Sequence, residues 1–173
     1  MSLIYLLSSL PLLSLDAPPG VAPDAFLAAC RDQLGAADAD AAEALLNGRS
    51  LAHPFVEAWS DKDAILRNAV ARQRARIAGT DASRWQRATR GCDAQIETGI
   101  EDAFQETDPA KKEKAIDKVR WTIAEELAGP DPLSLSTALA YAIKLAIVCR
   151  WHARDAVRGQ QAFDTLTQPP ITL

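Results

Sequence analysis

The chain has 173 residues, a formal net charge of −4 at pH 7, 48% hydrophobic residues and 6% aromatic residues. This length suits one domain that can bury a core without disulfides or a structural metal ion. The acidic balance argues against non-specific nucleic-acid binding by the whole surface. Abundant alanine and few β-branched runs predict an all-α fold. We expect a single helical domain at residues 1–168, built as a bundle of amphipathic helices around a buried C-terminal helix, and a frayed tail at 169–173.

The N-terminal stretch, residues 3–15, is apolar. No Lys or Arg precedes it and no suitable cleavage site follows, so we expect a packed segment and not a secretory signal. Pro11 restricts the residue before it and removes a backbone donor, so the segment is predicted to be partly extended. Leu6, Leu7 and Leu10 are expected to pack against the helices.

Apolar residues at helical spacing, bounded by proline and glycine, predict a series of amphipathic helices after this segment. They are expected at residues 23–34, 38–47, 60–78, 83–104 and 108–128. Pro54 is expected to open a separate turn of helix, and Ser60 with Asp63 resembles a capping box that would start the next one. Gly35 and Gly79 are predicted to end helices.

The stretch from residue 83 to residue 104 keeps a continuous helical spacing. It is predicted to be one helix despite Gly91 and Gly99, although glycine lowers helix stability. Trp85 and Cys92 are placed on its buried stripe.

The most apolar part of the chain lies within residues 135–158. From 138 to 149 every residue is apolar except Lys144. A helix that is apolar on all sides is buried on all sides, and this run is shorter than the roughly 20 residues needed to span a membrane. We therefore predict a central core helix. The cysteines, Cys30, Cys92 and Cys149, are widely spaced, which is typical of reduced core cysteines in a cytosolic protein.

Most catalytic patterns are missing from the sequence. His53 and His152 have no partner at metal-ligand spacing, and there is no glycine-rich phosphate loop and no Gly-x-Ser-x-Gly. We expect no catalytic residue, no metal and no cofactor. A cluster of carboxylates is interpreted as a solvated acidic face, with an enzyme that uses an unrecognised carboxylate site as a less favoured alternative. The cluster contains Glu97, Glu101, Asp102, Glu106 and Asp108.

A run of arginines provides the candidate partner-binding residues, with only Asp81 as a carboxylate among them. They are Arg67, Arg72, Arg74, Arg76, Arg84, Arg87 and Arg90. One interpretation is a basic surface for an acidic protein partner, and the other is a solvated face that pairs internally with the acidic helix after it. No aromatic ladder accompanies the arginines, so we do not expect nucleic acid as a partner.

Several short motifs, taken in order, resemble a known family. They are residues 5–11, Phe26-Leu27 with Cys30, Trp59 followed by Leu66-Arg67-Asn68 and Arg74-Ala75, and Lys144-Leu145 with Arg150-Trp151, Gly159 and Phe163. They resemble the bacterial proteins of unknown function encoded among the subunits of V-type (A/V-type) ATPases. They are also distantly similar to the helical socket protein of those machines, designated C (d in eukaryotes), which seats the central stalk on the membrane rotor ring.

The resemblance implies a non-catalytic accessory or central-stalk-linked subunit that acts by protein–protein contact in rotor assembly or coupling. V-type ATPase subunits would be its partners. It would be cytoplasmic, and peripheral at the membrane only through the ATPase complex. The other hypothesis is a free-standing helical adaptor or regulator.

Overall fold

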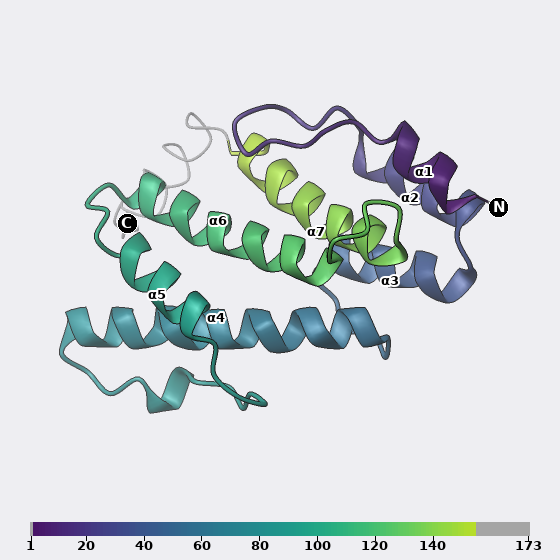
Figure 1. Cartoon of the computed structure of the whole chain (residues 1–173). Coiled ribbons are helices and arrows are strands. Elements are labelled where there is room, and N and C mark those ends of the chain that lie inside the picture. The colour runs from purple at the N-terminus through teal and green to yellow at the C-terminus, as the bar shows by residue number, and fades with distance from the viewer. Residues whose placement is uncertain (1, 155–173) are drawn as a thin grey trace, which may run out of the picture.

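The structure is a computed structural model that describes residues 2–154. These residues form helices joined by loops and contain no strand, which confirms the all-α prediction (Figure 1). The helices are α1 (Leu3–Ser9), α2 (Pro23–Gln33), α3 (Ala36–Leu46), α4 (Pro54–Ala78), the 3-10 turn η1 (Ser83–Trp85), α5 (Ala94–Ala103), α6 (Pro109–Ala128) and α7 (Leu135–His152). The last part of the expected domain, residues 155–168, and the expected tail at 169–173 lie outside the described residues.

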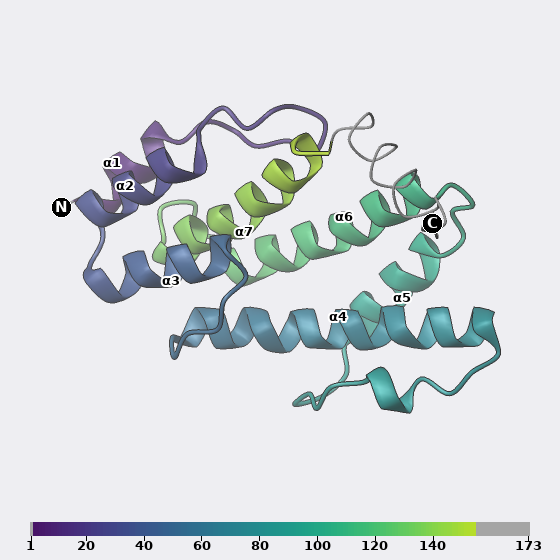
Figure 2. The same ribbon diagram turned by 180° about the vertical axis from the view of Figure 1, so that it is seen from behind.

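The helices are stacked side by side in layers. In Figure 1, α1 and α2 lie above α7, α6 lies below it, and α4 forms the opposite edge. α5 packs against both α4 and α6, and the view from behind shows α3 between α7 and α4 (Figure 2). α7 contacts α6, α3 and α1, so the predicted central helix is in the middle of the fold.

Two clusters of buried apolar side chains make up the core. The larger one joins α1, α2, α3 and α7 and includes Val56 of α4 and Ala124 of α6, and the smaller one joins α4, α5 and α6. Trp59 of α4 packs against both clusters. Within residues 138–149 only Lys144, Ala146 and Cys149 are partly exposed, so the prediction of a buried helix is confirmed.

The N-terminal segment is packed, as predicted. It begins with the helix α1, and its backbone becomes extended only at Leu10. The Ser2 hydroxyl accepts a hydrogen bond from the Tyr5 N–H at 3.3 Å, which caps α1. Leu6 is fully buried, and Leu7 and Leu10 pack partly buried against the larger cluster. The helix ends before Leu10, which is extended because it precedes a proline.

α4 is one continuous helix, which corrects the predicted second start at Ser60. His53 caps it: its Nδ1 accepts the Phe55 N–H at 3.2 Å, and Pro54 occupies the first turn. The Asp63 carboxylate binds arginine side chains and does not cap a helix. Gly79 ends α4 with a φ of 65°, in the left-handed region that favours glycine.

The predicted helix over residues 83–104 is wrong in its first half. Only η1 and α5 are helical there, and a loop joins them. Asp93 starts α5, because its Oδ1 accepts the Gln95 N–H at 3.0 Å and the Ile96 N–H at 3.2 Å. Trp85 is 53% exposed and Cys92 is also exposed, so neither belongs to a core stripe.

The other two cysteines lie closer to the predicted environment. Cys30 is fully buried, and burial raises the pKa of its thiol to about 11. Cys149 is partly exposed, and burial also raises the pKa of its thiol. All three are free thiols. Within residues 2–154 no helix is both long and apolar enough to cross a membrane.

Candidate functional site

The segment from residue 79 to residue 93, here named the arginine loop, is fastened to α4 through its backbone. The buried Asn68 side chain donates from Nδ2 to the Arg87 carbonyl at 2.8 Å and accepts the Arg87 N–H on Oδ1 at 2.8 Å. Asp61 accepts the Arg90 N–H at 3.2 Å. These contacts fix the main chain of the loop and leave the Arg87 and Arg90 side chains exposed.

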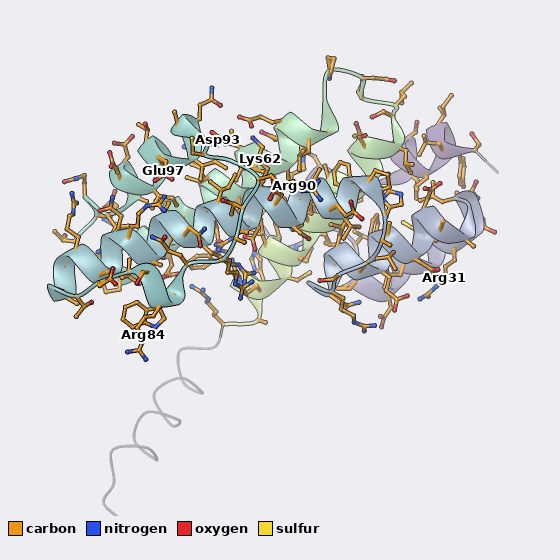
Figure 3. All side chains as sticks on the ribbon, turned by 90° about the horizontal axis from the view of Figure 1, so that it is seen from below. Arg31, Lys62, Arg84, Arg90, Asp93 and Glu97 are labelled. Atoms are coloured by element: carbon orange, nitrogen blue, oxygen red, sulfur yellow. The ribbon has the colours of Figure 1, made fainter. Side chains whose placement is uncertain are left out.

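The end of the arginine loop is held by an ion pair between Lys62 and Asp93. The hydrogen bond from Lys62 holds the pKa of the Asp93 carboxyl below its usual value, with smaller contributions from the N–H groups at the start of α5. Figure 3 shows Lys62, Arg90 and Asp93 close together where the loop passes over α4, and Arg84 farther along the same face. The guanidinium of Arg84 lies 5.1 Å from the centre of the Trp85 ring, a cation–π contact.

Three of the seven predicted arginines pair within the molecule. Arg67 binds Asp63 at 2.6 Å, Arg74 binds Glu113 at 3.2 Å, and Arg72 binds Glu97 of α5. Only Arg72 pairs with the acidic helix named in the internal-pairing interpretation, whereas Arg67 pairs within α4 and Arg74 pairs with α6.

The other four arginines remain exposed on α4 and the arginine loop. No ion pair joins Arg76, Arg84, Arg87 or Arg90 to another residue in the described part of the chain. The structure therefore divides the predicted site into a paired group on α4 and an unpaired group centred on the loop.

A largely buried ionic network between α4, α6 and α7 was not predicted from the sequence. Asp117 of α6 is 1% exposed and accepts hydrogen bonds from Arg120 at 2.9 Å, from Trp151 Nε1 at 2.7 Å and from Arg150. Arg120 also donates from Nε to Asp63 at 3.1 Å. The network links α4, α6 and α7. A carboxylate next to Ile116 on the buried side of α6 was the available signal in the sequence.

A groove opens between α4, α6 and η1, with a volume of about 520 Å³. Its charged lining consists of Arg67, Arg74, Glu113 and Arg120, and its apolar lining includes Val70 and Trp85. The groove thus brings two predicted arginines together with a carboxylate and an exposed tryptophan from other elements.

The carboxylates of the predicted acidic face occupy exposed positions, one helix cap and one ion pair. Glu97 pairs with Arg72, while Glu101, Asp102, Glu106 and Asp108 are exposed. Asp108 caps α6, and the two N–H groups it accepts lower the pKa of its carboxyl. In the described range, no three His, Cys, Asp or Glu side chains lie close enough together to hold a metal ion.

These features define an all-helical protein whose most distinctive surface is an arginine-bearing loop fastened to a long helix. Residues 96–168 match a family described as a protein of unknown function (DUF2764). This part of the chain, from α5 onward, is similar to that family, and it covers less than half of the 173 residues. No curated protein and no solved structure matches the chain.

Proposed function

We propose that the protein is a non-catalytic accessory subunit of a bacterial V-type ATPase, linked to the central stalk, that binds an acidic surface of another subunit. The observation that supports this role is a set of exposed arginines that form no ion pair within residues 2–154: Arg76, Arg84, Arg87 and Arg90. The identity of the partner rests on the resemblance of the collinear motifs described above.

The arginine loop suits such a contact because its backbone is already ordered. Asn68 and Asp61 fix the main chain at Arg87 and Arg90, so little conformational entropy remains to be lost there on binding. Exposed charges of one sign chiefly speed and orient docking, and salt screens them. Association should therefore weaken as the salt concentration rises.

The test is co-purification with the ATPase complex at low and high salt. The double variant Arg84→Gln/Arg87→Gln removes two loop charges, and no side-chain ion pair is lost with them. Arg72 is unsuitable for this purpose, because it joins α4 to α5 through Glu97. The matched control is Arg31→Gln/Arg49→Gln, which removes two exposed arginines beside Glu43. Figure 3 shows Arg31 at the other end of the molecule from Arg84.

We expect the wild-type protein and the control to co-purify at low salt and the loop variant to be largely lost. Absence of the wild-type protein from the complex at both salt concentrations would reject the ATPase association. Equal recovery of the loop variant and the control would reject the arginine loop as the contact.

A further inference from the structure

The groove between α4, α6 and η1 has the shape of a trough. Its lining on α4 extends from Arg67 to Ala78, which at about 1.5 Å per residue gives a length of about 16 Å. α6 forms the opposite wall with Glu113, Ile116 and Arg120. A trough of this length between two helices matches the space that a few turns of a third helix occupy in helix-in-groove recognition.

The floor of the groove is lined by apolar residues, and two of them are small. Ala71 and Ala75 leave the space open, and Val70 and Ile116 supply methyl groups. Trp85 adds an aromatic side chain that lines the same groove and is 53% exposed. Tryptophan and arginine are the residue types most enriched among those that dominate binding energy at protein interfaces.

The charges around the groove have an excess of positive sign. Three arginines line it against one carboxylate: Arg67, Arg74 and Arg120 against Glu113. Arg120 is fixed by two carboxylates, whereas Arg74 and Glu113 are 64% and 43% exposed. An exposed pair of this kind contributes little to stability, so Arg74 can change partner at low cost.

We propose that the groove binds a helical segment of a partner protein that has an apolar face flanked by carboxylates. Its apolar side chains would cover Val70, Ala71 and Trp85, and its carboxylates would pair with Arg67 and Arg74. The inference rests on the proposed function for the identity of the partner only. The groove adjoins the arginine loop at Trp85, but the groove variants used below, at Ala71 and Arg74, lie on α4 and outside the loop.

The experiment uses the full chain and two synthetic helical peptides. One has leucines on one face flanked by glutamates, and the other has lysines in place of the glutamates. Each is titrated into isotope-labelled protein, and binding is followed by the amide and tryptophan indole signals of the groove. We expect the glutamate peptide to shift the signals of Trp85 and its neighbours, and the lysine peptide to bind about tenfold or more weakly, as for opposed charges at an interface.

Two variants test the groove itself. Ala71→Phe fills the floor and keeps every charge, and Arg74→Gln removes one wall charge. We expect each to weaken the glutamate peptide about tenfold, the size of effect expected for a central interface residue. Arg31→Gln is the matched control, because Arg31 also pairs with a glutamate of the neighbouring helix and should leave the affinity unchanged. Helicity and melting temperature are measured for every variant.

The inference is overturned if the glutamate peptide fails to shift the groove signals, or if it binds folded Ala71→Phe as tightly as the wild type. The proposed function can fail separately. Ala71→Phe keeps the arginine loop intact, so undiminished co-purification of this variant with the ATPase would reject the groove and support the loop. If the protein binds the glutamate peptide but never co-purifies with the ATPase, the groove is supported and the ATPase association is rejected.

Discussion

Asp117 is the residue on which the buried ionic network depends. It is 1% exposed and accepts from Arg120, Arg150 and Trp151. Asp117→Ala would leave two guanidiniums and an indole N–H without their acceptor, and removing one partner of a buried ion pair costs about 3 kcal/mol or more. We expect a loss of this size in urea unfolding. Asp40→Ala, which removes an exposed carboxylate from α3, should change the free energy of unfolding by less than about 0.5 kcal/mol.

A loss for Asp117→Ala as small as that of the control would contradict this account. It would mean that water replaces the carboxylate as the partner of Arg120 and Arg150 without a loss in the free energy of unfolding. The hydrogen bond from Trp151 to Asp117 can also be tested independently of stability. A change in tryptophan fluorescence between the wild type and the folded variant would report its loss.

Asp93 links the pH dependence of stability to the start of α5. The hydrogen bond from Lys62 is the main reason why the pKa of its carboxyl is lowered in the folded protein. A lowered folded pKa means that the carboxylate stabilises the fold above its unfolded pKa, near 3.8, and that this contribution is lost as pH falls through the lower folded value.

Asp93→Asn keeps an efficient helix cap and removes only the charge. We expect it to be less stable than the wild type by about 0.5–1 kcal/mol at pH 7, the size of a partly exposed ion pair. The difference should shrink as the pH falls below 3.8 and through the lowered folded pKa of the wild-type carboxyl, which then becomes protonated. A difference that stays constant across this range in urea unfolding would show that the Lys62–Asp93 pair does not contribute.

The single residues that could be predicted from the sequence are those whose partners are near in the chain. Gly79 ends α4 through contacts within its own turn, and this role was predicted. Asn68 and Asp117 have partners 19 and 33 or 34 residues away. No local pattern carries that information, because these partners meet only after α4, α6 and α7 have packed.

At the scale of the helices, Gly99 sets the distance between α5 and α6. A Cβ at this position would lie 2.9 Å from Cγ2 of Val119. Valine has little freedom about χ1 in a helix, so the contact cannot be relieved easily. Gly99→Ala would gain up to about 1 kcal/mol of helix propensity, but crowding in a packed contact costs about 1–3 kcal/mol. We expect a net loss of about 1 kcal/mol in thermal unfolding.

The double variant Gly99→Ala/Val119→Ala tests whether crowding against Val119 causes the loss of stability. Removing the valine methyl groups should bring back most of the stability lost in Gly99→Ala. If Gly99→Ala alone is more stable than the wild type, the two helices have room to separate and the close approach is not a constraint.

Helix boundaries were predicted well where strong caps and apolar spacing agree, as for α6. The prediction failed where they disagree. Residues 83–104 keep the apolar spacing of a helix, but Asp93 offers a cap in the middle of the run and Gly91 precedes it. Local capping prevailed, and it placed Trp85 and three arginines on a loop instead of a helix face. The arginines were therefore singled out from the sequence, but the loop that carries three of them was not predicted.

At the scale of the whole molecule, the two apolar clusters share their supporting elements. On α6, Ile123 belongs to the smaller cluster and the adjacent Ala124 to the larger one, and Trp59 touches both. Neither cluster can lose its packing while the other keeps α6 and α4 intact. We predict a single cooperative unfolding transition, in agreement with the single domain expected from the sequence.

Coincident urea curves from far-UV circular dichroism and tryptophan fluorescence would support this prediction. Two separated transitions would contradict it, and Ile147→Asp would then identify which transition belongs to the larger cluster, because an unpaired charge in that core should abolish it.

The way the arginine loop is fastened has an evolutionary consequence. Asn68 and Asp61 bind only main-chain atoms of Arg87 and Arg90, and every residue type except proline presents the same N–H and carbonyl there. The identities of those side chains are thus free to drift while the scaffold that displays them is conserved. A lineage could exchange one binding partner for another by substitutions confined to this loop, without passing through a poorly folded intermediate.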